Sequence, residues 1–104
     1  LYDDSMNLKK LLLVNKNMFV NPPYSDIKTW VDWLILVHDH YKKDIKLLIP
    51  ARTDTKYFHE LLNYGVSIYA FKGRLKFGDS KNGAPFPSLL ITLKGDGQNI
   101  IRGV

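Results

Sequence analysis

Four consecutive residues, Asn21-Pro22-Pro23-Tyr24, carry the most specific chemistry in the sequence. The side-chain carbonyl of Asn21 accepts hydrogen bonds, and Pro22 offers a carbonyl without a backbone N–H beside it. Two acceptors that converge on one planar NH2 group would orient it and favour the pyramidal nitrogen needed to attack an electrophilic carbon. The ring of Tyr24 offers a face on which a flat base or amide stacks. The motif therefore predicts a site for a planar amino group; the alternative is a simple turn that ends a strand.

Positively charged residues supply a second group of candidates. Arg52 follows an apolar run, where a guanidinium can bind a phosphate or a carboxylate through two hydrogen bonds, or can be a solvated loop residue. A loop over residues 72–87 contains cations with aromatic residues among them, namely Lys72, Arg74, Lys76, Phe77, Lys81 and Phe86. Such a loop suits phosphates and an unstacked base; the alternative is a solvent-facing hairpin with its Phe rings beneath it. The formal net charge of +5 also favours a polyanionic partner.

Composition argues against several other kinds of site. The 104 residues include no cysteine, which excludes disulfides, thiolate metal ligands and a cysteine nucleophile, and fits a reducing compartment such as the cytoplasm. His38 and His40 stand two apart on a predicted helix and point to different sides, so we expect no metal site. Apolar runs such as residues 11–14 fall far short of the roughly 20 residues that span a bilayer, and we expect no membrane partner.

The elements that must position these residues follow from hydrophobic periodicity. We expect a short helix over residues 3–14 and strands over residues 18–20, 45–49, 66–71 and 88–93. Helical spacing predicts a long helix from an N-cap at Ser25, with Asp26 in its first turn, to about Lys43. A second helix is expected to begin at Thr53 or Asp54 and to end at Gly65. The residues after 93 are expected to form a polar tail.

The order of these elements predicts an α/β fold in one domain, residues 1–104. Apolar strands that alternate with helices favour a mostly parallel sheet flanked by helices. No helix separates the strand over residues 88–93 from the strand before it, so this last strand should be antiparallel. Because parallel strands end at the same edge of a sheet, the motif at Asn21, the segment after residue 49 and the loop after residue 71 should share one edge.

The ordered set of segments resembles the phage DNA N6-adenine methyltransferase (Dam-like) family. The segments that carry the resemblance are residues 19–25, Trp30, and residues 48–60, 72–79 and 84–88, so that it extends over residues 17 to 94. The resemblance implies a partial Rossmann-like class I methyltransferase fold, S-adenosylmethionine as cofactor and methyl transfer to N6 of adenine in DNA. In that case Asn21, Pro22 and Pro23 would hold the amino group of a flipped base, and Tyr24 would stack on it. Asn21 and Arg52 would also contact the cofactor.

The segment that precedes the motif departs from the family's pattern. Family members have there a segment that builds much of the methionine and ribose pocket, whereas this sequence has no Gly-rich turn or acidic strand end before Asn21. We therefore expect an incomplete domain, either the C-terminal catalytic portion of a longer enzyme or a nucleic-acid-binding remnant without catalysis. The strand over residues 18–20 should then have an open edge, and the chain should be marginal in stability or form a homo-oligomer. Methylation of a protein glutamine amide is a further alternative, because an amide also presents a planar NH2 group.

Overall fold

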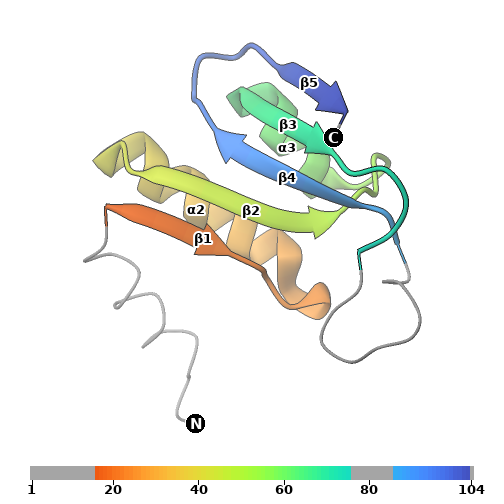
Figure 1. Ribbon diagram of the computed structural model, residues 1–104. Coiled ribbons are helices and arrows are strands. Elements are labelled where there is room, and N and C mark those ends of the chain that lie inside the picture. The colour runs from red at the N-terminus through yellow and green to blue at the C-terminus, as the bar shows by residue number, and fades with distance from the viewer. Residues whose placement is uncertain (1–15, 76–85, 104) are drawn as a thin grey trace, which may run out of the picture.

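The computed structural model describes residues 16–75 and 86–103, which form a five-stranded sheet and two α-helices (Figure 1). The elements in chain order are β1 (Asn17–Val20), a 3₁₀ turn η1 (Tyr24–Asp26), α2 (Ile27–Tyr41), β2 (Asp44–Pro50), α3 (Lys56–Tyr64), β3 (Val66–Ala70), β4 (Ser88–Leu93) and β5 (Ile100–Gly103). The two helices contact each other and lie behind the sheet in Figure 1. The expected helix over residues 3–14 lies outside the described residues.

The strands are arranged in the order β1-β2-β4-β3-β5. β1 pairs in parallel with β2, and β3 pairs in parallel with β5, whereas β4 is antiparallel to both β2 and β3. Since β2 and β3 both run opposite to β4, the carboxyl ends of β1, β2, β3 and β5 lie along one edge of the sheet. We call this edge the carboxyl rim; it comprises residues 21–25, 51–55, 71–74 and 86–87.

The sheet is mixed, with two parallel and two antiparallel pairings, so the expected mostly parallel sheet is only partly right. The antiparallel relation of β3 and β4 is confirmed. The expectation that β4 is the last strand is wrong, because β5 forms in the segment expected to be a polar tail. Gly95 and Gly97 have φ values of +81° and +71°, which let the chain turn back. The side chain of Asn99 then holds the start of β5 against β3 and α3, through bonds to Val66 and Leu62.

The two helix starts differ from the predicted N-caps. Ser25 lies within the 3₁₀ turn η1, since the carbonyl of Pro23 accepts a hydrogen bond from the N–H of Asp26 (3.0 Å), and α2 begins at Ile27. Asp26 therefore takes the N-cap position, without a side-chain hydrogen bond. α3 is capped by Thr55 and not by Thr53 or Asp54. The Thr55 hydroxyl accepts a hydrogen bond from the N–H of Phe58 (3.4 Å).

The two helix ends are set by backbone conformation. α2 ends at Tyr41, slightly before the predicted end, because Lys42 adopts the left-handed conformation (φ +55°) and donates its N–H to the carbonyl of His38 (2.8 Å). Gly65 ends α3 as predicted, with φ +102° and its N–H bonded to the carbonyl of Leu61 (3.0 Å). Each helix therefore leads directly into the next strand.

The hydrophobic core lies between the sheet and the two helices. The largest fully buried side chains come from α2, α3 and the three strands β2, β3 and β4: Val31, Leu34, Ile45, Leu47, Ile49, Leu61, Val66, Ile68 and Ile91. Trp30 is buried, and its ring packs edge-on against half-buried Trp33, with ring centroids 5.9 Å apart. This core lies on one face of the sheet only. It anchors β1, β2 and β4 to the helices and thereby positions the carboxyl rim.

The strand that precedes the Asn-Pro-Pro-Tyr motif lies at the edge of the sheet. Within residues 16–75 and 86–103, β1 pairs with β2 alone, which agrees with the open edge expected for it. Met18 and Val20 face the core, and Phe19 between them is 61% exposed. The motif therefore continues from an edge strand whose alternation is set by the one-sided core.

Candidate functional site

The carboxyl rim brings together the segments that the sequence singled out. The Asn-Pro-Pro-Tyr motif follows β1, Arg52 follows β2, and Lys72 and Arg74 follow β3. The segment that enters the antiparallel strand β4 adds Phe86 to the same edge. The prediction that three separate segments share one edge of the sheet is confirmed. Lys76, Phe77 and Lys81 lie outside the described residues.

The motif forms a turn that exposes its polar and aromatic members. Pro22 is buried, whereas Asn21 and Pro23 are exposed and Tyr24 is 47% exposed. Pro23 is extended (φ −62°, ψ 140°), and neither proline has an N–H with which to continue the β1–β2 ladder. The chain therefore leaves the sheet at Asn21 and enters η1 at Tyr24. Both side chains predicted to handle a planar amino group are accessible at the rim.

Three side chains from three different segments lie together in a group that we call the rim cluster: Tyr24, Arg52 and Phe86. The rings of Tyr24 and Phe86 lie with centroids 6.3 Å apart and planes tilted by 57°. The guanidinium carbon of Arg52 lies 5.2 Å from the centroid of the Phe86 ring. Sequence reasoning placed Phe86 only in a basic loop. Its pairing with Tyr24 depends on β4 lying next to β2, which no local pattern indicates.

Backbone hydrogen bonds hold Arg52 in place. Its carbonyl accepts bonds from both the N–H (3.3 Å) and the hydroxyl (2.7 Å) of Thr55, and its own N–H donates to the carbonyl of Pro50 (2.9 Å). Next to it, the N–H of Ala51 donates to the carbonyl of Pro87 (2.8 Å) and fixes the segment that carries Phe86. The segment after β2 is therefore tied to the cap of α3 and to the entry of β4.

A buried tyrosine lies beneath this segment. Tyr57 of α3 donates its hydroxyl to the carbonyl of Pro50 at 3.4 Å. Burial raises the pKa of the Tyr57 phenol, so that it stays a protonated donor at neutral pH. Tyr57 thus supports the end of β2 from the helix side, and we assign it a structural role.

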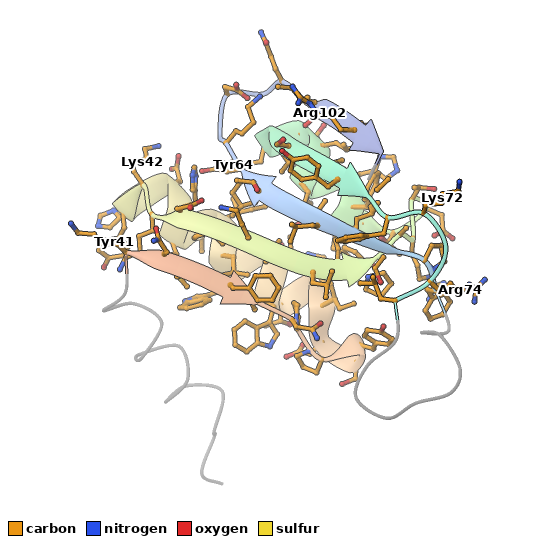
Figure 2. The ribbon with its side chains drawn as sticks, in the orientation of Figure 1. Tyr41, Lys42, Tyr64, Lys72, Arg74 and Arg102 are labelled. Atoms are coloured by element: carbon orange, nitrogen blue, oxygen red, sulfur yellow. The ribbon has the colours of Figure 1, made fainter. Side chains whose placement is uncertain are left out.

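The basic part of the rim follows β3. Phe71 donates its N–H to the carbonyl of Ser88 (3.4 Å), which extends the pairing of β3 with β4. Lys72 and Arg74 are exposed, and Gly73 between them has φ +73° with nothing within 4 Å of an added Cβ. Figure 2 shows both cations beyond the carboxyl end of β3. Both cations are exposed at the edge that an approaching anion would meet.

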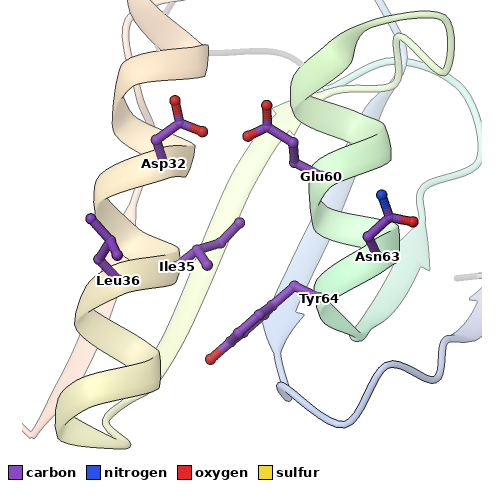
Figure 3. Close-up of a pocket in the computed structure, with 6 residues that line it drawn as sticks. All are labelled: Asp32, Ile35, Leu36, Glu60, Asn63 and Tyr64. Carbon is purple, nitrogen blue, oxygen red and sulfur yellow. The ribbon is translucent and has the colours of Figure 1, made fainter.

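A separate groove lies between the two helices and contains no rim residue (Figure 3). Its volume is about 510 Å³, and it is lined by Asp32, Ile35, Leu36, Glu60, Asn63 and Tyr64. Lys28 bonds to the carboxylates of Asp32 (2.7 Å) and Glu60 (2.9 Å). A side-chain hydrogen bond shared with Glu60 and the bond donated by Lys28 lower the pKa of Asp32, and the bonds that Lys28 donates to Asp32 and Glu60 raise the pKa of Lys28. The Lys28–Glu60 pair links α2 to α3, the Lys28–Asp32 pair lies within α2, and neither involves a residue of the predicted site.

Metal and membrane sites were also sought in the described residues. No group of three or more His, Asp or Glu side chains there is arranged to hold a metal ion. His38 is buried, and its Nδ1 lies 2.5 Å from the hydroxyl of Tyr64, so the two histidines of α2 do not act together. None of the helices in residues 16–75 and 86–103 is long and apolar enough to cross a membrane.

The fold and the rim together define an α/β protein compatible with a methyltransferase. The model of the family described as DNA N-6-adenine-methyltransferase (Dam) matches residues 3–92, and the chain belongs to this family. The matched range includes β1 to the penultimate residue of β4 and therefore the whole carboxyl rim. Searches of curated proteins and of solved structures gave no match. The resemblance expected from the sequence is confirmed at the level of the family.

Membership in this family indicates a DNA adenine methyltransferase, with DNA as substrate and a general dependence on S-adenosylmethionine. It agrees with the net charge of +5 and with the exposed cations that follow β3. The family match covers residues 3–92 together and assigns no role to any single residue. The roles of single residues rest on the geometry of the rim and are proposed below.

Proposed function

We propose that the carboxyl rim is the methyl-acceptor site of a DNA adenine-N6 methyltransferase. The observation that carries this proposal is the position of Asn21-Pro22-Pro23-Tyr24. Asn21, Pro23 and Tyr24 of the motif are exposed at the end of β1, inside the range that matches the family. Pro23 starts the turn that brings Tyr24 to the surface. The carbonyls of Asn21 and Pro22 accept hydrogen bonds from the two N6 hydrogens of adenine.

These two hydrogen bonds prepare the nitrogen for reaction. In free adenine the N6 lone pair is delocalised into the ring, which makes the nitrogen a poor nucleophile. Acceptors that hold both N–H bonds favour a pyramidal nitrogen whose lone pair points away from the base plane. Both acceptors also stabilise the positive charge that develops on the nitrogen as it attacks. When bound, S-adenosylmethionine supplies the methyl group as an electrophile.

The base must leave the duplex to reach this site. N6 of a stacked adenine cannot approach carbonyls at the end of a strand, so the base is flipped out, at a cost of a few kcal/mol. Tyr24, with 47% of its surface exposed, stacks on the flipped base and offsets part of that cost. Lys72 and Arg74 bind the flanking phosphates, and we extend this role to Lys76 and Lys81 of the same loop, while its Phe77 offers a ring to an unstacked base.

The residues on the rim fit one part of the cofactor. Arg52 is exposed, and a guanidinium binds a carboxylate such as that of the methionine moiety, or a DNA phosphate, through two hydrogen bonds. Asn21 stands at the end of the neighbouring strand, where the methyl group must be delivered. In the described part of the chain no acidic side chain directly follows β1, β2 or β3 to bind ribose hydroxyls. We propose that these contacts come from outside the described residues.

This missing ribose ligand also favours a second candidate function, a nucleic-acid-binding protein without catalysis. Calorimetric titration of the full chain with S-adenosylmethionine separates the two. The enzyme is expected to release heat of specific binding, and Arg52→Gln should weaken that binding. Absence of binding, together with retained affinity for DNA, would establish the second function in place of the first.

The acceptor is tested by transfer of a labelled methyl group. The full chain is incubated with labelled S-adenosylmethionine and either duplex DNA or a glutamine-containing peptide. Label in DNA is expected. We also propose that the protein acts in the cytoplasm of a bacterial or phage-infected cell, where DNA is accessible. Label in the peptide alone would contradict the proposal and support methylation of a protein glutamine amide.

A further inference from the structure

The rim cluster contains a residue whose role goes beyond binding an anion. We infer that Arg52 is a positioning residue for Tyr24 and acts through the ring of Phe86. The inference rests on the proposed function, because it assigns a task to the ring that stacks on the flipped base. It adds that Arg52, which follows the neighbouring strand β2, sets the direction of the Tyr24 ring.

The order of the strands places Arg52 between the two aromatic residues. Tyr24 follows β1, Arg52 follows β2 and Phe86 precedes β4, and β2 lies between β1 and β4 in the sheet. The distance of 5.2 Å between the guanidinium carbon and the Phe86 centroid is within the roughly 6 Å of a cation–π contact. The ring separation of 6.3 Å is within the range of about 4.5–7 Å for interacting aromatic pairs. One ring therefore contacts both the cation and the tyrosine.

The three members of the cluster differ in how firmly they are held. The backbone of Arg52 is fixed by two hydrogen bonds from Thr55, and Pro87, beside Phe86, is fixed by a bond from Ala51. Tyr24 instead begins a three-residue 3₁₀ turn that has no side-chain cap, and its ring is about half exposed. The Tyr24 ring contacts Phe86, and we take this contact to set the direction of the ring. Phe86 in turn is held from one side by the guanidinium.

The planar guanidinium explains why this residue is an arginine. A guanidinium stacks on a ring with its flat face while its edge still donates hydrogen bonds, whereas an ammonium is a compact charge that stacks poorly. Arg52→Lys thus keeps the positive charge but removes the flat group that lies 5.2 Å from the Phe86 centroid. If Arg52 served only to bind an anion, this substitution would leave the Tyr24 ring unchanged. If Arg52 holds Phe86, the substitution changes the environment of the Tyr24 ring even in the free protein.

The test follows the Tyr24 ring directly. The full chain is labelled with 3-fluorotyrosine, and the Tyr24 signal in the ¹⁹F NMR spectrum is assigned by its loss in Tyr24→Phe. We expect Phe86→Leu to shift this signal, and Arg52→Lys to shift it in the same direction by a smaller amount. The double variant should match Phe86→Leu alone, because Arg52 has no ring left to hold. Phe86→Trp keeps an aromatic face and should return the signal towards its wild-type position.

The matched control is Arg102→Lys, the same change on β5. In the sheet, β4 and β3 lie between β5 and β2. It should leave the Tyr24 signal in place. An unmoved signal in Arg52→Lys, with a shifted one in Phe86→Leu, would overturn the positioning role of Arg52. An unmoved signal in both would overturn the coupling as a whole. Unfolding midpoints of each variant identify a shift that comes from lost structure, and such a shift in Arg52→Lys would also count against the inference.

The spectra are recorded without DNA or cofactor, so they decide the inference independently of activity. Failure of the wild-type chain to methylate DNA would contradict the proposed function and leave the ring measurement intact. Where the chain is active, Arg52→Lys is expected to lower kcat on DNA several-fold, and Phe86→Trp should retain most of the wild-type kcat. A change confined to the KM for S-adenosylmethionine would instead assign Arg52 to the cofactor alone.

Discussion

The two edges of the sheet use their polar residues differently. At the carboxyl rim, Asn21 and Arg52 are exposed, and the guanidinium of Arg52 lies next to the Phe86 ring. The opposite edge, where β1, β2, β3 and β5 begin, is called the amino edge. There Asn99 accepts a hydrogen bond from Val66 N–H (2.9 Å) and donates one to the Leu62 carbonyl (3.0 Å). The amino edge uses polar groups to lock loops to helices and strands. The rim leaves them accessible, as binding to a ligand requires.

Polar groups at the amino edge also join α2 to α3. At the amino edge, His38 Nδ1 and the Tyr64 hydroxyl lie 2.5 Å apart and connect the ends of the two helices. Gly95 packs against Tyr64, since an added Cβ would come within 3.0 Å of its hydroxyl. Substitutions at the amino edge are therefore expected to cost stability, and substitutions at the rim to cost function. The following predictions test this division, from the largest expected effect to the smallest.

Glycine substitutions should separate the two edges most strongly. Gly65→Ala at the amino edge places a Cβ 2.5 Å from the Gly97 nitrogen at φ +102°, so we expect a loss of about 3 kcal/mol or more. Gly73→Ala at the rim has a similar positive φ of +73° but meets nothing within 4 Å, and should cost about 1 kcal/mol. Urea unfolding of both variants measures the difference. Equal losses would show that the amino edge is no more tightly packed than the rim.

Asparagine substitutions give the next largest effect. Asn99→Ala leaves the buried N–H of Val66 without its side-chain partner, and we expect a loss of about 1–3 kcal/mol in the free energy of unfolding. Asn21→Ala, at an exposed position, should change it by less than about 0.5 kcal/mol. The division between the edges fails if Asn21→Ala is the more destabilising of the two.

Removal of one cation tests the division for DNA binding. Lys72→Asn at the rim should weaken binding and reduce the slope of log affinity against log salt by about 1. Lys42→Asn makes the same change at the amino edge (Figure 2), and Asn tolerates the φ of +55° found there. We expect no change of slope in this control. Fluorescence anisotropy of a labelled duplex over a range of salt concentrations measures both; equal slopes in the two variants would contradict the assignment of the rim.

The smallest effect is a pH dependence of the amino edge. Burial lowers the pKa of His38 below its usual 6.5, so the unfolded chain binds a proton more readily than the folded one. The stability that comes from neutral His38 is therefore complete above pH 6.5 and decreases as the pH falls through the depressed pKa. The difference in unfolding free energy between pH 7.5 and 5.5 should be smaller in His38→Gln than in wild type. His40→Gln, an exposed neighbour, should keep the wild-type difference; the reverse order would contradict this role of His38.

Much of the rim could be predicted because it depends on local pattern and strand direction. The apolar runs over β1, β2 and β4 are unambiguous, and consecutive prolines after Val20 can only end a strand. The antiparallel pairing of β3 and β4 follows from the lack of a helix between them. These features required no knowledge of which strands are neighbours.

The parts that were missed depend on tertiary contacts. β5 is exposed at all four positions and has no alternating pattern, and it is fixed by Asn99 through bonds to residues more than thirty positions away. Thr53, Asp54 and Thr55 are all acceptable helix caps, and the selection of Thr55 depends on the turn formed at Arg52. The contact of Phe86 with Tyr24 requires β4 to lie beside β2. Local propensity contains no information on any of these three.

The central claim is that Asn21 holds the N6 amino group of adenine. The most direct measurement is mass spectrometry of nucleosides from duplex DNA incubated with S-adenosylmethionine and the full chain. Wild type and Asn63→Ala, the same change at an exposed position of α3 in the groove between the helices, are expected to produce N6-methyladenine at equal rates. Asn21→Ala should reduce the rate by at least about 100-fold, the typical effect of one charge-stabilising group. Formation of N6-methyladenine at the wild-type rate by Asn21→Ala would contradict the account.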